Sequence, residues 1–505
     1  MRLTLVQVLT RHGDRTSIVP LPVETRAQWA PWLVPEGQAK ALAAVAAPDP
    51  NLPRPSLIDA TREDWHGQLT TQGVAQLVDT GAQLRAWLVD GGRPDGEHAG
   101  GGALLPVTHD EARRAAAITI RATGTNRTLQ SAQALIAGLY PGAYSVAPPA
   151  PLPVEVRQRA RESMFPNPGL ACARHLELLR SLDADAEVLA AERAAWERAP
   201  LAELRAVVHD RNVAARAREL EEALAAAEAQ KVAEESADGS NVTHFTAPPS
   251  TAHPSERAGE TTVASVSEPI AASPRGARTE DGVDARARAL GVPAHLLREP
   301  RQPSATAVWE PLQARANHGL PLPSGVDATD LATVRRAAEV RHILRASNAE
   351  AAALAGGRLL KELADEIEDV VGERANQRLS VYSGHDASII ALLAAMGAFE
   401  GEWPPVASTV VVETWRGGGG GRGGARWSTR SYPAEVRAGR PEADAMVRVV
   451  FNGRVIDLPG CAEQEPLHRG GLCPLEAFVA MADRKNPRNY EEACKLKGKR
   501  GRARM

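Results

Sequence analysis

The sequence predicts an α/β protein with an open, mostly parallel sheet flanked by helices. Three segments favour this fold class, because each looks like a strand that is covered on both faces and ends in a polar turn. The strands are expected over residues 3–10, 116–123 and 379–386. Strand-then-helix units of this kind build sheets whose ligand site lies beyond the carboxyl ends of the strands.

The first strand, LTLVQVLT over residues 3–10, is almost continuously apolar and β-branched, and charged residues end it. A strand with one face in solvent would instead alternate between apolar and polar side chains. We therefore expect this strand to be central in the sheet.

The second and third strands each lead into a helix. After residues 116–123, apolar side chains recur at helical spacing until Pro141 stops the pattern. These positions are Leu129, Ala132, Leu135, Ile136 and Leu139. After residues 379–386, the segment ASIIALLAAMGAF continues as an apolar helix. The three polar turns are therefore expected at one edge of the sheet, where helix N-termini present free N–H groups.

Composition separates the rest of the chain into parts. We assign residues 1–145 and 320–495 to the α/β core. Residues 146–233 are assigned to a smaller helical cap, because Ala, Glu, Arg and Leu dominate residues 184–231 and clusters of β-branched residues are missing there.

Residues 234–306 are rich in Ser, Thr, Pro, Ala, Gly and charged side chains, with very few large apolar ones. Such a segment buries too little surface to offset the entropy of ordering, so we expect a long disordered insertion. The glycine-rich residues 416–424 are expected to form a hairpin tip, and the basic residues 496–505 a solvated tail.

The overall charge excludes one kind of binding. The chain has 505 residues with 59 basic and 62 acidic side chains, a net charge of −3. It therefore lacks a global attraction to nucleic acid or to an anionic membrane, and any anion must be bound by a local cluster of Arg or Lys. No apolar run approaches the ~20 residues that cross a bilayer, so no transmembrane segment is expected.

Four cysteines are too few for a disulfide scaffold, and their wide spacing contains no CxxC pair that suggests zinc. They are Cys172, Cys461, Cys473 and Cys494. Two bridges and four inert thiols are both compatible with this pattern.

Arg11, His12, Gly13, Asp14 and Arg15 follow the first strand directly. Arginine is planar and permanently charged, so it can donate two parallel hydrogen bonds to a phosphate, whereas lysine offers a point charge. The glycine lets the backbone turn sharply. This cluster predicts a phosphoryl pocket, although a surface turn with satisfied side chains has the same sequence.

The other two strands end in further candidate residues. Arg121 ends the second strand, with Arg127 following at the helix start, and it would add a third guanidinium. The alternative for Arg121 is a surface ion pair. His385 and Asp386 end the third strand, where the alternatives are a buried, satisfied histidine and a helix N-cap. Because three separate stretches place such side chains at one sheet edge, we favour the functional interpretation.

At these positions the sequence resembles the histidine acid phosphatases, a branch of the histidine phosphatase superfamily that contains the prostatic and lysosomal acid phosphatases and the phytases. Residues 11–16, RHGDRT, resemble the first signature of this family. Residues 121–141 resemble its middle arginine segment, and residues 383–397 its histidine-aspartate signature. Weaker similarities follow in order over residues 67–85, 318–323, 403–415, 447–461 and 472–478, so the resemblance covers most of the chain except the insertion.

The resemblance implies an acid phosphatase that uses neither a metal nor another cofactor. His12 would attack the phosphorus of a monoester and form a phosphohistidine, because imidazole is a competent nucleophile when one nitrogen is unprotonated. Asp386 would be the general acid, which favours activity at acidic pH. The phosphate would be bound by Arg11, Arg15, Arg121 and His385.

The resemblance also implies disulfides between Cys172 and Cys494 and between Cys461 and Cys473. Paired cysteines indicate an oxidising compartment, so a lysosomal or secreted location is expected. The first residues lack the features of a secretory leader, and a cytoplasmic relative with reduced thiols is the alternative. The expected partner is a small phosphomonoester or a phosphoprotein, without nucleic acid, and a homodimer is a further expectation from the family.

Two departures from the family pattern stand out. Ser17 replaces the usual proline after the first signature, which changes the stiffness of a turn. Gly124 replaces an acidic residue, which removes a charge near Arg121. Two alternative functions stay open: a phosphoglycerate-mutase-like phosphotransferase, against which the His385-Asp386 pair argues, and a non-catalytic scaffold of the same fold.

Overall fold

The computed structural model describes residues 1–52, 65–92, 103–146, 148–167, 172–214, 223, 302–417, 445–461 and 471–496. The chain divides into two units, Met1–Leu204 with Pro303–Met505 and Arg205–Gln302. Few residues of the second unit are described, so the fold below is that of the first unit. The predicted insertion up to residue 301 lies outside the described residues, as do the hairpin tip and the basic tail, apart from residues 416, 417 and 496.

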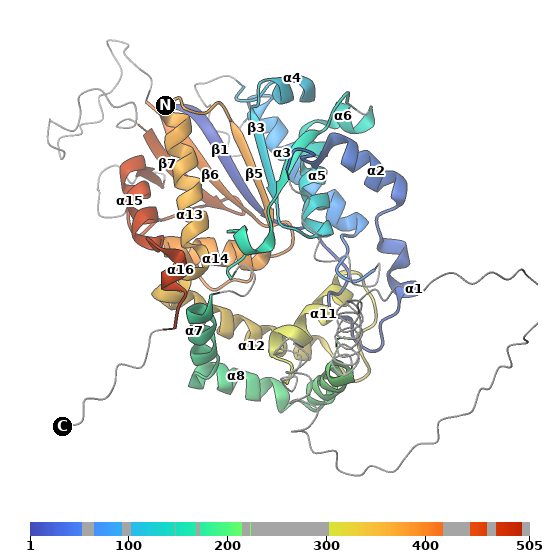
Figure 1. The fold of residues 1–505 in the computed structure, drawn as a ribbon. Coiled ribbons are helices and arrows are strands. Elements are labelled where there is room, and N and C mark those ends of the chain that lie inside the picture. The colour runs from blue at the N-terminus through green and yellow to red at the C-terminus, as the bar shows by residue number, and fades with distance from the viewer. Residues whose placement is uncertain are drawn as a thin grey trace, which may run out of the picture. The chain divides into compact units, whose positions relative to one another are not determined.

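A sheet forms the centre of the first unit (Figure 1). Its strands are β1 (Arg2–Arg11), β2 (Ala46–Pro48), β3 (Ile118–Ala122), β4 (Leu152–Val156), β5 (Leu379–Gly384), β6 (Thr409–Arg416), β7 (Ala445–Phe451), β8 (Arg454–Ile456) and β9 (Leu472–Pro474). They follow the order β2-β4-β3-β5-β1-β6-β7-β8, with β9 paired to β7. Strands β2, β4, β3, β5 and β1 are parallel, and the strands from β6 onward add an antiparallel half.

The predicted fold class is confirmed. Strand β1 pairs with β5 on one side and with β6 on the other, so it is central, and all of its residues from Leu5 to Arg11 are buried. The other two predicted strands are β3 and β5. They pair directly with each other, in parallel, from Ile118 opposite Leu379 to Ala122 opposite Ser383.

The predicted domain boundaries differ from the structure at several points. Strand β4, which we assigned to the cap, lies in the sheet between β2 and β3. Its side chains alternate between buried and more exposed positions, so it lacks the continuous apolar run that marks the central strands. Residues 305–306, which we assigned to the insertion, begin a helix, because the following Val308, Trp309 and Leu312 are buried.

The described helices cover both faces of the sheet and form a separate group beside it. They include α1 (Arg26–Trp29), α2 (Glu36–Val45), α3 (Thr71–Leu88), α4 (His109–Arg114), α5 (Asn126–Leu139), α6 (Pro141–Ser145), α7 (Ala173–Asp183), α8 (Ala186–Trp196), α11 (Ala305–Asn317), α12 (Ala328–Ser347), α13 (Ala349–Val371), α14 (Asp386–Met396), α15 (Leu475–Lys485) and α16 (Tyr490–Ala493), with short 3-10 turns at Ala30–Trp32 and Arg159–Arg161.

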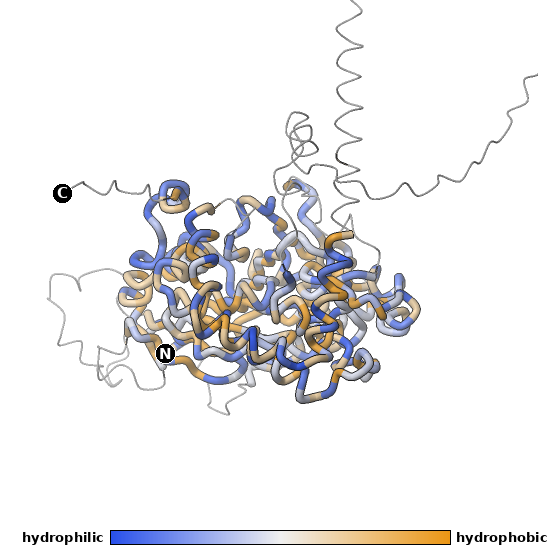
Figure 2. Tube along the Cα trace, turned by 90° about the horizontal axis from the view of Figure 1, so that it is seen from below, coloured by the Kyte–Doolittle hydropathy of each residue, from blue (hydrophilic) through white to orange (hydrophobic). Residues whose placement is uncertain are grey.

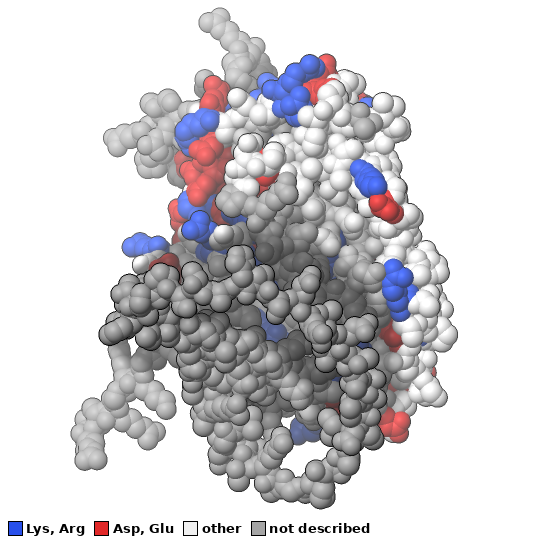
Figure 3. Space-filling model, turned by 45° about the vertical axis from the view of Figure 1, so that its right-hand side comes forward, with Lys and Arg blue, Asp and Glu red and all other residues white. Residues whose placement is uncertain are grey.

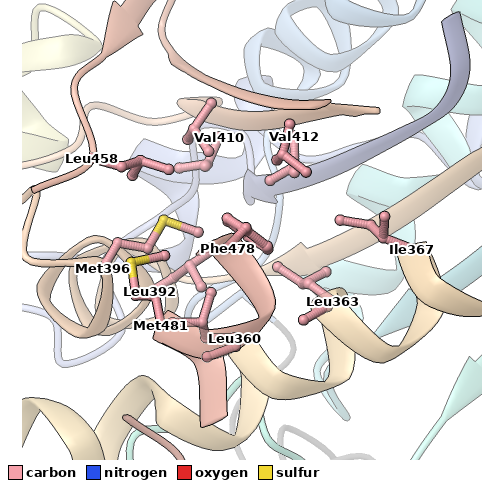
Figure 4. Close-up of a cluster of buried hydrophobic side chains, with 14 of the residues drawn as sticks. Leu360, Leu363, Ile367, Leu392, Met396, Val410, Val412, Leu458, Phe478 and Met481 are labelled. Atoms are coloured by element: carbon pink, nitrogen blue, oxygen red, sulfur yellow. The ribbon is translucent and has the colours of Figure 1, made fainter. Parts of the chain in front are cut away.

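Successive side chains of β1 enter two different cores. Val6 and Val8 pack with α3 and α5 on one face, and Leu5 and Leu9 pack with α13, α14 and α15 on the other (Figure 1). Figure 4 shows part of the second core, where Phe478 of α15 lies between Leu363 of α13 and the strand β6. The apolar segments concentrate inside the unit, with hydrophilic segments around them (Figure 2). Burial of both faces explains the continuous apolar run of β1.

Helices α7, α8, α11 and α12 form the cap beside the sheet (Figure 1). Ion pairs link them: Arg341 of α12 contacts Glu192 of α8 at 2.6 Å, and Arg345 of α12 contacts Asp183 of α7 at 2.7 Å. Asp327 caps α12 by accepting a hydrogen bond from the Asp330 N–H at 2.8 Å. The cap therefore combines helices from before and after the insertion, and it includes α12, although we assigned residues 320–495 to the core.

Two disulfides stabilise the unit, with the pairing that the family resemblance implies. Cys172 at the start of α7 is bonded to Cys494 after α16, and Cys461 is bonded to Cys473. The first bridge therefore ties the cap to the end of the described chain.

Among the described residues, no helix combines the length and the apolar character that crossing a bilayer requires. On the face shown in Figure 3, the described Lys and Arg side chains lie beside Asp and Glu side chains rather than in one large patch.

Candidate active site

The three predicted turns meet at the carboxyl ends of β1, β3 and β5. The His12 N–H donates to the Gly384 carbonyl at 3.0 Å, and the Thr123 N–H donates to the Ser383 carbonyl at 3.1 Å. The imidazole rings of His12 and His385 lie 5.5 Å apart between centroids and nearly perpendicular, at 73°. Residues from distant parts of the sequence thus form one buried cluster.

The backbone around His12 depends on glycine. A Cβ atom added to Gly13 would lie 2.3 Å from the carbonyl oxygen of Gly73 in α3, closer than atoms can approach. Thr70 caps α3 by accepting a hydrogen bond from the Gly73 N–H at 3.1 Å. The turn after β1 therefore packs directly onto the first turn of this helix.

His12 is held as a neutral imidazole. Its Nδ1 lies 2.8 Å from the Gly13 carbonyl oxygen, which can only accept a hydrogen bond, so the proton belongs on Nδ1. Burial, followed by the charges of Arg127, Arg11 and Arg15, holds the pKa of His12 well below its ordinary value. Nε2 therefore keeps its lone pair.

Two nitrogen atoms of the Arg11 guanidinium are bonded to other described residues, and the third is not. Its Nη1 donates to the Pro404 carbonyl at 2.6 Å, and its Nη2 forms an ion pair with Asp386 at 2.9 Å. Its buried Nε has no hydrogen-bond partner among the described residues. A buried N–H without a partner is costly, so an anion at this point would complete the site.

Arg15 has a similar arrangement. Its Nη1 donates to the Thr16 carbonyl at 2.9 Å, its Nη2 forms an ion pair with Glu310 of α11, and its buried Nε has no partner among the described residues. A pocket of about 210 Å³ borders both Arg11 and Arg15. The two guanidinium groups therefore reach a cavity in which a small anion fits.

Asp14, which lies between these arginines, anchors the turn. Its carboxylate accepts a hydrogen bond from Thr70 Oγ1 at 2.7 Å, contacts His318 Nε2 at 2.5 Å, and accepts from Asn317 Nδ2 at 3.2 Å. Sequence reasoning gave Asp14 and His318 no role. Their pairing was hidden because they lie 304 residues apart.

Arg121, which we predicted as a phosphate ligand, does not join this cluster. Its Nη1 forms an ion pair with Glu362 of α13 at 2.6 Å, and its Nη2 contacts Glu162 at 3.2 Å and donates to Ser163 at 2.8 Å. Its guanidinium also lies over the Tyr382 ring, 5.0 Å from the centroid. The reason is positional: Arg121 lies within β3, so its side chain points onto a sheet face and into the carboxylates there.

Arg127, rather than Arg121, is the arginine after the start of β3 whose charge acts on the two imidazoles. It lies in the first turn of α5, is buried, and exerts the strongest charge effect on the pKa of both His12 and His385. Side chains in a first helical turn lie near the preceding strand's carboxyl end, where the site is. That rule, applied to the segment after β3, is the signal that would have selected Arg127.

His385 and Asp386 begin α14 next to His12. His385 Nε2 lies 2.9 Å from Thr123 Oγ1, and the Phe165 ring stacks on the His385 ring at 5.4 Å. Burial, followed by the charge of Arg127, lowers the pKa of His385 to about 3. Burial alone would raise the pKa of Asp386, but Arg11 and then His385 lower it overall, so this carboxyl is ionised in the free site.

Comparison with known proteins identifies the family. The family described as "Histidine phosphatase superfamily (branch 2)" matches residues 2–248 and 304–452, which make up most of the chain. The chain belongs to this superfamily. The predicted family and enzyme class, a phosphoric monoester hydrolase, are thereby confirmed.

Individual relatives of this histidine phosphatase are distant. Testicular acid phosphatase of Homo sapiens is 24% identical over 417 residues, which cover 81% of this chain and 67% of that protein. Lysosomal acid phosphatase of Bos taurus is 27% identical over 194 residues, which cover 38% of this chain and 40% of that protein. Among solved structures, the phytase of Klebsiella sp ASR1 is 17% identical with a TM-score of 0.46, and the alignment covers 98% of this chain and 99% of that one.

Proposed function

We propose that this histidine phosphatase hydrolyses phosphate monoesters through a phosphohistidine on His12. The observation that carries the proposal is the 2.8 Å contact of His12 Nδ1 with the Gly13 carbonyl oxygen, which leaves the lone pair on Nε2 in a buried site with cationic side chains. Arg127, Arg11 and Arg15 all act on its pKa. A nucleophile beside several cations suits a phosphoryl group, whose oxygens concentrate negative charge.

The proposed phosphate ligands are Arg11, Arg15, Arg127 and His385. The unpartnered Nε groups of Arg11 and Arg15 are ready donors, and guanidinium groups stabilise the charge on the equatorial oxygens in the transition state. Arg121 is no longer part of the proposed set, because carboxylates occupy its guanidinium.

In the first step, the Nε2 lone pair of His12 forms the P–N bond while the bond from phosphorus to the ester oxygen breaks. Asp386 gives its proton to the departing oxygen, and in the second step it accepts a proton from the water that breaks the P–N bond. The free site holds Asp386 ionised, mainly against Arg11. A bound phosphate competes with Asp386 for Arg11 and adds negative charge. Both effects raise the pKa of Asp386, so this carboxyl is protonated at acidic pH before the first step.

The test is hydrolysis of p-nitrophenyl phosphate at pH about 5 by the full chain, with and without EDTA. We expect turnover that survives chelation, and loss of turnover in His12→Ala with an unchanged thermal unfolding transition. Quenching with radiolabelled substrate should trap an acid-labile phosphoenzyme in the wild type alone. Full activity of His12→Ala would refute the proposal. Absence of turnover at any pH would favour a scaffold, and exchange without net phosphate release a mutase.

We further propose that the protein works in an oxidising compartment, either the lysosome or outside the cell. The two disulfides support this, because such bonds persist where thiols are not kept reduced. One relative, from Bos taurus, is named lysosomal acid phosphatase. Localisation of the tagged chain in its source cells, together with the thiol content of the isolated protein, tests the assignment.

A further inference from the structure

Helix α11 forms a wall of the pocket that borders Arg11 and Arg15. Trp309, Glu310 and Gln313 of this helix line the pocket, and Trp403 lines it from the segment before β6. The indole rings of Trp309 and Trp403 lie 4.6 Å apart between centroids, at 73°. None of these side chains takes part in the proposed hydrolysis, and their position on the pocket wall would let them contact the alcohol part of the ester.

Glu310 carries a negative charge at the point where phosphate would bind. Its carboxylate forms an ion pair with Nη2 of Arg15, and 29% of its side chain is exposed, whereas only 5% of the Arg15 side chain is. A phosphate dianion that binds Arg15 must share this guanidinium with Glu310 or displace the carboxylate. In both cases Arg15 no longer neutralises Glu310.

The other charged side chains of the pocket do not restore this neutralisation. Arg11 is paired with Asp386 at 2.9 Å and is itself a proposed phosphate ligand. Arg335 also lines the pocket, but half of its side chain is exposed and its Nε donates to Glu339 at 2.8 Å. Asp14 adds a further negative charge. When phosphate is bound, none of the described cationic side chains that line the pocket therefore neutralises Glu310.

We propose that Glu310 is a specificity-determining residue that selects phosphate esters whose alcohol carries a positive charge. This inference rests on the proposed function and names its substrate class: monoesters of amino alcohols, with an ammonium group a few atoms from the ester oxygen. The ammonium would neutralise Glu310 in the pocket that Trp309 and Trp403 also line. A carboxylate or second phosphate in this position would instead be repelled.

A series of three esters of similar size tests the inference. O-phosphoethanolamine, glycerol 1-phosphate and 2-phosphoglycolate carry a positive, a neutral and a negative alcohol part. For the wild type we expect kcat/KM to fall in this order, by about fivefold at each step, as for a partly exposed charge pair. High salt should reduce the ratios, because it screens the partly exposed Glu310.

Three variants assign the preference to this side chain. Glu310→Gln should bring the three kcat/KM values to within about twofold of each other, and Glu310→Asp should keep the order. Glu36→Gln is the matched control, because Glu36 is an exposed residue of α2 that pairs with Lys40, and it should keep the wild-type ratios. Thermal unfolding of each variant checks that it is folded.

The possible failures are distinguishable. Equal kcat/KM values for the three esters in the wild type would overturn the inference, and so would a charge preference that persists in Glu310→Gln. Hydrolysis of p-nitrophenyl phosphate is measured in parallel. If p-nitrophenyl phosphate is hydrolysed and the three esters have equal kcat/KM values, the role proposed for Glu310 is wrong but the proposed function stands. If no ester is hydrolysed, the proposed function fails and this inference fails with it.

Discussion

Exchange of two neighbouring arginines for glutamine should separate catalysis from stability. The charge of Arg127 lowers the pKa of His12 and His385, whereas Arg121 is held by Glu162 and Glu362. We expect Arg127→Gln to lower kcat/KM by about 10²–10³-fold, the usual effect of removing one donor to a developing charge. Thermal unfolding of Arg127→Gln, measured alongside, checks that the loss of activity is that of a folded protein.

Arg121→Gln should lower the stability of the protein more than its activity. Glu162 is fully buried and would lose its cationic partner, whereas Glu362 keeps Arg157 at 3.0 Å. Breaking a buried pair costs about 3–5 kcal/mol, and we expect the lower end because only one carboxylate is stranded. Burial already raises the pKa of Glu162, so this carboxyl can take up a proton and limit the cost.

The assays are p-nitrophenyl phosphate hydrolysis and urea-induced unfolding, measured for both variants under the same conditions. Arg121→Gln should lose about 3 kcal/mol of unfolding free energy while its folded fraction retains kcat/KM within about tenfold. The reasoning is refuted if Arg127→Gln keeps full activity, or if Arg121→Gln is as stable as the wild type but as inactive as Arg127→Gln is expected to be.

Three further predictions concern the framework around the site. Burial lowers the pKa of His175 to about 4 against about 6.5 in the unfolded chain, so this group should contribute a loss of about 1.4 kcal/mol of stability per pH unit between those values as acid is added; because His12 and His385 add losses of the same sign, His175→Gln should reduce the slope in urea unfolding by this amount only. Replacing both Cys172 and Cys494 by alanine should cost up to about 5 kcal/mol, read as a lower unfolding temperature than that of the oxidised wild type, because the bridge closes a separation of 322 residues. Gly13→Ala should abolish activity and lower stability, since its Cβ would collide with the backbone of α3, whereas Gly37→Ala in α2, with open space around it, should be neutral or slightly stabilising; equal behaviour of the two would contradict the packing argument.

The sequence predicts the part of this molecule that depends on local patterns. Strands β1, β3 and β5 were recognisable because burial on both faces makes them continuously apolar. The motifs at Arg11 and His385 could be placed at one edge because parallel strands share a direction. Strand β4 was missed, since its alternating burial resembles many irregular segments.

The choice between Arg121 and Arg127 shows where sequence reasoning fails. Both arginines lie at the junction of β3 and α5, and composition alone does not distinguish them. The difference arises from Glu362, which lies on α13, 241 residues away, and satisfies Arg121 from across the sheet face. The Glu310–Arg15 pair likewise joins positions 295 residues apart. Long-range charge partners of this kind become visible only in three dimensions.

The bond between Cys172 and Cys494 has a consequence for proteolysis. A protease that cuts once between residues 214 and 302 would produce one fragment with His12 and Arg127 and another with His385 and Asp386. Each fragment would contain one half of this bridge, so the two would stay covalently joined. Such a nicked protein would migrate as one band on a gel without reductant and as two bands with it, and it would retain both halves of the catalytic cluster in a single particle.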